Sequence, residues 1–396
     1  TVNWDTTAKT ASFTAVSGNG YFVNTTSGAI TVTLPASPSS GDIVSISDYT
    51  GTFGTNNCTV GRNSSNINGS ASDWVIAVTD TSITFVYVDG TEGWRVVNTS
   101  LPSETENPFL SATGGTETTC GDFKIHTFTG PGTFTVCKVG AVDANNVVDY
   151  LVIAGGGGGD NANGGGGGGG GGGYRESCGT CYTSSPLGCG VSALPVTAQG
   201  YPITVGAGGG GGTFTPVPSD PEGERGSNSV FSTITSTGGG AGSGNGPNNP
   251  AMPGGSGGGA SYAQPIGTGN TPPVSPPQGN PGGSASGSPP VYGGGGGGGA
   301  TAAGTNGHST YRGNGGAGGT SSINGTPTGR SGGGGGGGIT SSPGGTASDG
   351  GGAGGGGANG TSGTTNTGGG GGGSGAFPRT SGSGGSGIVI IRYKYQ

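Results

Sequence analysis

Nothing in this sequence limits the fold more than a glycine-rich region that extends from Ala154 to Ile388. It contains a run of ten glycines at 164–173 and shorter runs such as 293–299 and 332–338. After residue 150 more than one residue in three is glycine, without the Gly-X-Y period of collagen. Such a composition is compatible with two structures, a flexible coil or a packed array of polyglycine II helices.

The choice between coil and array is a question of backbone energetics. Ordering one residue costs about 1–2 kcal/mol of backbone entropy, and glycine has the most freedom to lose. Almost no apolar side-chain area offsets this cost, which favours the coil. In the array, helices with three residues per turn and no internal hydrogen bonds would bond to their neighbours, and only glycine permits so close an approach. We expect the array, as a slab of antiparallel runs.

Composition narrows the function classes. Charged residues make up 8% of the chain, the formal net charge is −7, and no lysine lies between 139 and 393. Without a basic patch, we expect no nucleic-acid partner. No apolar run approaches the roughly 18 residues that cross a bilayer, so we expect no membrane insertion. The chain begins at Thr1 rather than Met, which leaves open whether a segment precedes it.

Residues 1–100 predict a small all-β module. Short runs rich in β-branched and aromatic residues alternate with turn residues, and Asp89-Gly90 predicts a hairpin. The module would be a sandwich or would share its core with copies of itself. Residues 101–119, which include Pro102 and Pro108, predict a linker. The expected strands lie at 11–15, 20–24, 29–34, 42–47, 58–60, 74–78, 82–88 and 94–98.

Residues 120–154 predict a β base for the glycine-rich region at 155–387. The segments 123–128 and 133–139 flank Gly130-Pro131-Gly132 and predict a hairpin, and 147–153 predicts an apolar strand. Residues 388–396 predict a C-terminal strand that pairs with 147–153, so that the glycine region leaves and returns at one place. The fold class is therefore all-β plus polyglycine II, without helices.

Five cysteines, Cys120, Cys137, Cys178, Cys181 and Cys189, are candidates for disulfides. The last three lie within twelve residues and have no histidine near them in sequence, so a local disulfide is favoured over a metal site, which needs four ligands. Cys120 and Cys137 flank the predicted hairpin, but an offset across it leaves their pairing open. We expect no metal and no cofactor. Cysteines in a chain with few lysines fit an extracellular setting.

No set of residues in the sequence predicts a catalytic site. The two histidines are His126 and His308, and His126 lies on a predicted strand opposite the face of Phe123 and Ile125, which predicts a surface position. No lysine follows a glycine run as phosphate binding requires. A nucleophile, a base and an oxyanion donor are not found together, so we expect no enzyme activity.

Segments with side chains separate the glycine runs and are expected to form loops at the ends of the slab. Their aromatic residues have almost no core to enter, and tyrosine suits the recognition of sugars or protein surfaces. Alternatively, these residues plug the ends of the slab or pack on neighbouring chains. The candidate binding residues are Tyr262, Gln264, Tyr292, His308, Tyr311, Arg312, Phe377 and Arg379.

Several segments resemble a known family. GDFKIHTFTGPGTFTV at 121–136, YLVIAG at 150–155 and GIVIIRY at 387–393 are similar to the glycine-rich domain of phage tail-fibre proteins, especially of marine phages. GYFVN at 20–24 and ITVTLP at 30–35, with GTNN at 54–57, are similar to an upstream fibre module of the same proteins. The chain also resembles the fibre-tip adhesins of T-even-like phages, in which a polyglycine II sandwich carries loops that contact the host receptor.

This resemblance implies a function. The chain would be a non-enzymatic tail-fibre adhesin, located in the virion and extracellular, that binds a host cell-surface glycan or outer-membrane protein through the loops. It would associate with other fibre proteins and form a homotrimer. The cysteine segment and the Pro-rich loop at 261–292 match no pattern of the family, so no single binding residue is carried over. The alternatives are a structural subunit of a secreted extracellular filament or surface fibre and, disfavoured by the irregular loops, an ice-binding protein.

Overall fold

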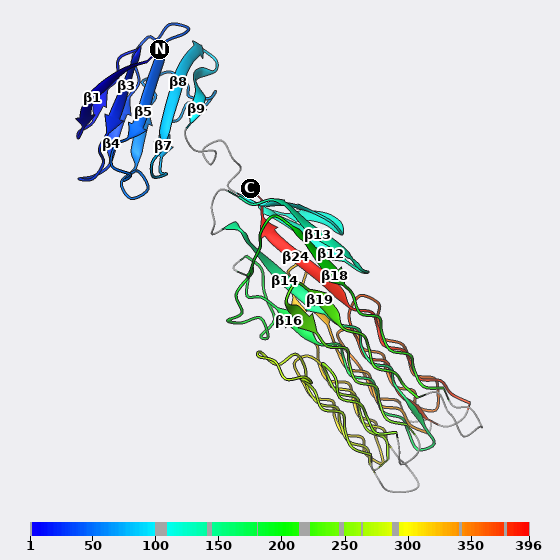
Figure 1. Cartoon of the computed structure of the whole chain (residues 1–396). Coiled ribbons are helices and arrows are strands. Elements are labelled where there is room, and N and C mark those ends of the chain that lie inside the picture. Colours follow the sequence, from blue (N-terminus) through cyan, green and yellow to red (C-terminus); the bar gives the residue numbers. More distant parts are fainter. Residues whose placement is uncertain are drawn as a thin grey trace. The chain divides into compact units, whose positions relative to one another are not determined.

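A computed structural model describes residues 2–99, 109–140, 145–179, 181–213, 222–244, 249–262, 264–286, 293–339, 343–375 and 378–395. The chain divides into two compact units, Thr1–Pro108 and Phe109–Gln396 (Figure 1). Every regular element in the described residues is a β-strand, which confirms the predicted all-β fold class. Among these residues no helix is present that could span a lipid bilayer.

The first unit consists of two facing sheets, with strand orders β1-β3-β5-β8-β9 and β2-β4-β6-β7. Eight of its strands overlap the segments expected from the sequence, and β1 is additional. The antiparallel pairing of β8 with β9 confirms the hairpin at Asp89-Gly90. The strands are β1 (Asn3–Lys9), β2 (Phe13–Thr14), β3 (Asn19–Val23), β4 (Ile30–Thr33), β5 (Ile43–Asp48), β6 (Cys58–Gly61), β7 (Trp74–Ile76), β8 (Ser82–Asp89) and β9 (Gly93–Thr99).

The chain crosses from one sheet of this unit to the other after each of its first strands. β1, β3 and β5 pair in parallel in one sheet, and β2, β4 and β6 pair in parallel in the other. Parallel neighbours need a connection longer than a hairpin, and here a strand of the facing sheet supplies it. Phe53, Phe85 and Trp94 are fully buried between the sheets. The unit therefore has a core of its own within one chain.

The second unit also contains two facing sheets, with orders β10-β13-β18-β19-β20 and β11-β12-β24-β14-β16, to which β17 adds beside β14. Two short pairs, β15 with β23 and β21 with β22, lie outside them. The strands are β10 (Ser111–Thr113), β11 (Thr116–Cys120), β12 (Phe123–Phe128), β13 (Gly132–Lys138), β14 (Val147–Ile153), β15 (Asn161–Ala162), β16 (Tyr174–Glu176), β17 (Leu194–Pro195), β18 (Gly200–Thr204), β19 (Ser229–Phe231), β20 (Ile234–Ser236), β21 (Gly319–Ser321), β22 (Thr328–Arg330), β23 (Ser374–Gly375) and β24 (Ile388–Lys394).

The two apolar strands that bracket the glycine region lie side by side. β14 and β24 pair antiparallel, as predicted, with Ile153 opposite Ile388. Val152 and Val389 belong to the core between the two sheets, whereas Leu151 belongs to a second core on the other face. A strand covered on both faces has a nearly continuous apolar sequence. The glycine region thus leaves and returns at one place (Figure 1).

The double coverage of this sheet corrects the position expected for His126. The side chain is fully buried rather than on the surface. Its Nδ1 lies 2.7 Å from the carbonyl oxygen of Gly114, and its Nε2 lies 3.2 Å from the Tyr393 hydroxyl. Alternation on β12 sends Ile125 into one core and His126 against the rings of Tyr393 and Phe134 on the opposite face. Both faces of β12 are covered at this position, so the face opposite Phe123 and Ile125 is not a surface face.

Two predictions about the base are wrong. β10 and β11 lie within the linker expected at 101–119, of which 101–108 is outside the described residues. β11 has little burial because it is an edge strand that pairs with β12 through its main chain. β12 and β13 do not form a hairpin, since they belong to different sheets. The turn at Gly130-Pro131 instead carries the chain across the core.

Beyond the sheets, the glycine runs are extended segments that bond to one another through the main chain. Along 155–160, N–H groups three residues apart donate to the same neighbour. Residues 155 and 158 donate to 224–227, 156 and 159 to 382–385, and 157 and 160 to 167–170. We call these runs the glycine lattice; it comprises 155–160, 165–173, 206–212, 223–228, 237–244, 250–260, 267–270, 278–283, 293–299, 303–307, 312–318, 331–337, 344–348, 351–355, 360–364, 368–373 and 381–387.

The longest run shows why the lattice needs glycine. Within 166–173, every third N–H again bonds to the same neighbour, drawn from 368–374, 237–243 and 295–298. A Cβ on Gly169 would overlap the carbonyl oxygen of Gly157, and one on Gly168 would overlap that of Gly334. The period of three is the period of a polyglycine II helix. The assignment of the runs to that helix type stays a prediction.

Candidate functional site

The glycine lattice leads away from the sheets to turns at the far end of the second unit (Figure 1). Contacts between these turns are polar and short. Asn249 donates from Nδ2 to Asp160 Oδ2 at 2.8 Å, and Asn161 donates from Nδ2 to the Arg379 carbonyl at 2.7 Å. The Ser243 hydroxyl donates to that of Ser261 at 3.1 Å. We call the described residues of these turns the distal loops: 161–164, 261–262, 264–266, 284–286, 308–311, 338–339, 356–359, 374–375 and 378–380.

Most of the predicted binding residues fall in the distal loops. Tyr262 and Tyr311 are 44% and 58% exposed, and the Tyr311 ring stacks on His308 with centroids 5.1 Å apart. Gln264 is half-buried and Arg379 is exposed. Tyr292 and Phe377 lie outside the described residues. The prediction that the segments between glycine runs form loops at one end of the lattice therefore places these five residues correctly, although the segments have no apolar periodicity.

Arg312 is a correction to the predicted binding set. Its side chain is only 3% exposed and lies against the main chain of Gly338 in a neighbouring run. Burial lowers the pKa of its guanidinium. Arg312 was expected to be exposed because it follows Tyr311 in sequence, but it is the first residue of the next run of the lattice. Arg312 thus packs inside the lattice and not on its end.

Asp160 links the lattice to the distal loops. Its carboxylate is 3% exposed and accepts a hydrogen bond from the Asn161 main-chain N–H at 2.7 Å besides the one from Asn249. Burial raises the pKa of Asp160 to about 6, although the hydrogen bonds from Asn249 and Asn161 oppose the shift. A carboxylate that titrates in this range makes the anchoring of the loops sensitive to pH.

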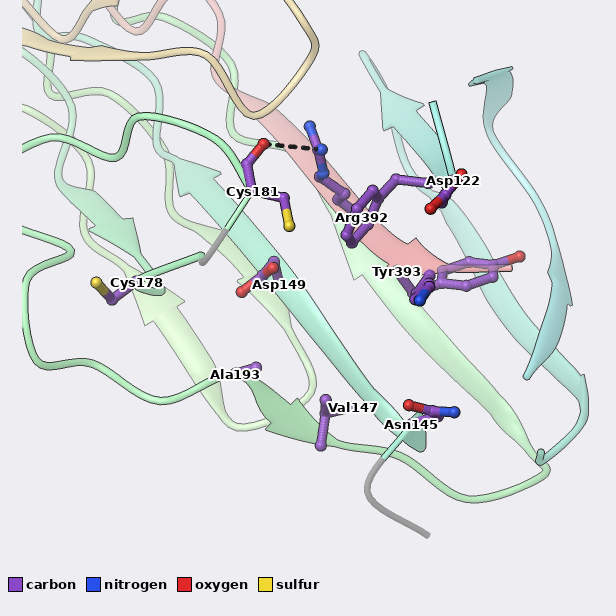
Figure 2. Close-up of a pocket in the computed structure, with 11 residues that line it drawn as sticks. Asp122, Asn145, Val147, Asp149, Cys178, Cys181, Ala193, Arg392 and Tyr393 are labelled. Carbon is purple, nitrogen blue, oxygen red and sulfur yellow. Dashed lines mark hydrogen bonds between the residues drawn. The ribbon is translucent and has the colours of Figure 1, made fainter. Parts of the chain in front are cut away.

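A second candidate region, absent from the sequence-based expectations, is a cleft of about 410 Å³ at the sheet end of the unit. Figure 2 shows Asp149 on β14 and Arg392 on β24, with the thiol of Cys181 directed toward Asp149. Asp149 and Arg392 are opposite one another in the strand register. The cleft is lined by Asp122, Phe123, Asn145, Val147, Asp149, Cys178, Cys181, Ala193, Arg392, Tyr393 and Lys394.

Arg392 is the central polar group of this cleft. It is 3% exposed and donates from Nη1 to the Ile323 carbonyl at 3.3 Å and from Nη2 to the Cys181 carbonyl at 3.2 Å. Its guanidinium lies 4.3 Å from the centroid of the Phe123 ring. The position of Arg392 in the apolar run IVIIRY at 388–393 does not by itself indicate a binding site. Only the packing of the segments around Cys181 and Ile323 onto β24 makes it part of a site.

The predicted disulfides are not formed in the structure. Cys120, Cys137, Cys178 and Cys189 are free thiols, as is the buried Cys58. Cys120 lies on β11, at the edge of one sheet, and Cys137 lies on β13 in the other, because the hairpin expected to join them does not exist. Among the described residues, no group of three or more His, Cys, Asp or Glu side chains is arranged to hold a metal ion.

Comparison with known protein families fits this architecture. A family model described as a glycine-rich domain matches residues 128–394. The chain belongs to the glycine-rich domain family. The family match begins at the last residue of β12 and ends at the last residue of β24, so it includes β13 to β24, the glycine lattice and the distal loops. No curated protein matches the chain.

Proposed function

We propose that this glycine-rich domain protein is a non-enzymatic adhesin of a phage tail fibre, carried on the virion outside the cell. It binds a host cell-surface glycan or an outer-membrane protein through the distal loops. The glycine lattice is the support that presents these loops, and the β base joins the support to the rest of the fibre.

One observation carries this proposal. Among the described residues of the second unit, the large apolar side chains that are exposed are Tyr262, Ile266 and Tyr311. All three lie in the distal loops. Exposed apolar groups gathered at one place are typical of binding sites, and aromatic rings lose little entropy when they bind.

The lattice supplies a second argument. Most of its hydrogen bonds join main-chain groups, so most of its stability does not depend on the side chains of the distal loops. A binding surface works best on a rigid support that orders its contact residues before the ligand arrives. The stacked pair of His308 and Tyr311 is such a preordered surface, with a polar ring beside a phenol hydroxyl.

The test is the binding of the purified full chain to candidate host cells, compared with a Tyr262→Ala/Tyr311→Ala variant. We expect saturable binding by the parent chain and a loss of about tenfold or more in affinity for the variant, since aromatic anchors dominate interface energies. The matched control is Val75→Ala, which removes an apolar side chain of similar exposure (52%) from the first unit.

The other outcomes have clear meanings. Equal loss in the Val75→Ala control would contradict a loop-borne site. No saturable binding by the parent chain, together with long fibres in negative-stain images, would favour the structural filament and overturn the adhesin proposal.

A further inference from the structure

The cleft at the sheet end contains a buried positive charge without an anionic partner. Arg392 is 3% exposed, and no carboxylate of the described residues lies within ion-pair distance of it. Its Nε–H is buried and has no hydrogen-bond acceptor. Buried polar groups are nearly always satisfied, and a buried charge is normally paired. The Arg392 guanidinium therefore has no carboxylate of the described residues in direct contact with it.

Two carboxylates, those of Asp149 and Asp122, line the cleft, but neither lies within ion-pair distance of Arg392. Asp149 is opposite Arg392 in the register, but its Oδ1 accepts a hydrogen bond from the Ser177 hydroxyl at 2.9 Å. Burial raises the pKa of Asp149, against the lowering effects of Ser177 and Arg392. Asp149 thus contacts the Ser177 hydroxyl rather than the guanidinium, and it lines the cleft, where a ligand hydroxyl can bond to it.

The walls of the cleft define the chemistry of an occupant. Lys394, which is exposed, lines the cleft together with Arg392 and adds a second positive charge. Asp149 on β14 and Asn145, which precedes that strand, offer polar groups, and Val147 and Ala193 are apolar lining residues. A volume of about 410 Å³ lies at the small end of the range for ligand pockets, so it suits a molecule of monosaccharide size.

We propose that this cleft binds a small hydroxylated carboxylate of the size of an acidic monosaccharide. Its carboxylate lies on Arg392 and Lys394, and its hydroxyls bond to Asp149 and Asn145. Arginine presents a planar set of donors that matches a carboxylate, and the Nε–H that has no acceptor belongs to that set. The site lies on the β base and is separate from the distal loops.

The first experiment is isothermal titration of the full chain with D-galacturonate and D-glucuronate. D-galactose and D-glucose are the matched controls, because they differ in lacking the carboxylate. We expect saturable binding of at least one uronate and none of either neutral hexose under the same conditions. Binding should weaken as salt is added, because two cations hold the ligand.

A thiol footprint locates the bound ligand. The thiol of Cys181 is directed into the cleft, whereas Cys137 is exposed elsewhere on β13. We expect saturating uronate to slow the alkylation of Cys181 by iodoacetamide and to leave the rate at Cys137 unchanged. Equal rates at Cys181 with and without uronate would place any binding elsewhere and overturn the proposal.

Two variants separate recognition from folding. Lys394→Gln removes an exposed charge and should weaken uronate binding about three- to tenfold without changing the melting temperature. Arg392→Lys keeps the charge but loses the planar donors, and should weaken binding further. Arg392 also donates to two main-chain carbonyls, so the melting temperature of the Arg392→Lys variant is measured in parallel. If that variant fails to fold, the result for Lys394→Gln decides the question.

The proposal is overturned if neither uronate binds, or if uronate and neutral hexose bind equally. It is also overturned if Lys394→Gln binds as tightly as the parent chain. None of these outcomes bears on host attachment, which is measured with intact cells and depends on Tyr262 and Tyr311.

Discussion

Asp160 shows how much one side chain matters in a lattice made of main chain. It ends a glycine run, and its two carboxylate oxygens hold Asn249 and the main chain of Asn161. Its folded-state pKa of about 6 lies above the ordinary value of 3.8. The folded protein therefore keeps this proton at pH values where the unfolded chain releases it, so the contribution to stability is complete below 3.8 and is lost as the pH rises through about 6.

This sign gives a prediction for Asp160→Asn. The parent chain should lose about 2 kcal/mol of stability from this group as the pH is raised from 4 to 7. The variant should lack that part of the slope and be the more stable protein above pH 7, provided that the Asn249 amide turns its oxygen toward the new amide. Denaturant unfolding at pH 4, 5, 6 and 7 measures both slopes. Parallel curves for the two proteins would refute the assignment.

At the scale of elements, the glycine run 165–173 is the centre of the lattice. Gly169 donates to Gly371, accepts from Gly334, and has no room for a Cβ next to the carbonyl of Gly157. Gly130 lies in the turn that joins two sheets and has nothing within 4 Å of an added Cβ. Glycine is thus required at position 169 for the close approach of two main chains, whereas position 130 has room for a side chain.

The two sites make a matched pair of substitutions. Gly169→Ala should destabilise the second unit by about 1–3 kcal/mol or more, because the added methyl group forces main chains apart. Gly130→Ala should change the stability by less than about 0.5 kcal/mol. Thermal unfolding of both variants tests this, and an equal effect at the two positions would show that close packing is not what selects glycine.

The elements also show what could be predicted from the sequence and what could not. β14 and β24 were found because their apolar runs are long and unbroken, and their pairing followed from the need to close the glycine region. β12 and β13 were wrongly paired because a Gly-Pro-Gly turn does not reveal whether it stays within a sheet or crosses to another. Arg392 could not be found, since its cleft is built by segments that are distant in sequence.

At the scale of the whole molecule, the open question is how many chains assemble. Of the two alternatives for the first unit, the structure favours the sandwich over a shared core, because Phe53, Phe85 and Trp94 are buried within one chain. The exposed apolar residues of that unit, such as Val97, Tyr49 and Val16, are then candidates for contacts between chains.

We predict a homotrimer. Light scattering coupled to size exclusion should give three times the mass of one chain at micromolar concentration. A Val97→Arg/Tyr49→Arg variant should shift the mass toward one chain, since charges are unfavourable in the middle of an apolar interface. A monomer for the parent chain would show that the trimer expectation is wrong, and a trimer unaffected by the variant would place the interface elsewhere.

The threefold pattern of hydrogen bonds in the glycine lattice has a consequence for how such proteins change. Each run has a fixed register, since successive N–H groups donate to three different neighbouring runs in a fixed order. Deleting one glycine from the middle of a run directs every later N–H group to the wrong neighbour. Deleting three glycines removes one complete turn and leaves each later group facing its own neighbour. Lineages that keep this lattice should therefore lengthen or shorten their runs in triplets, while the turns between them accept insertions of any size.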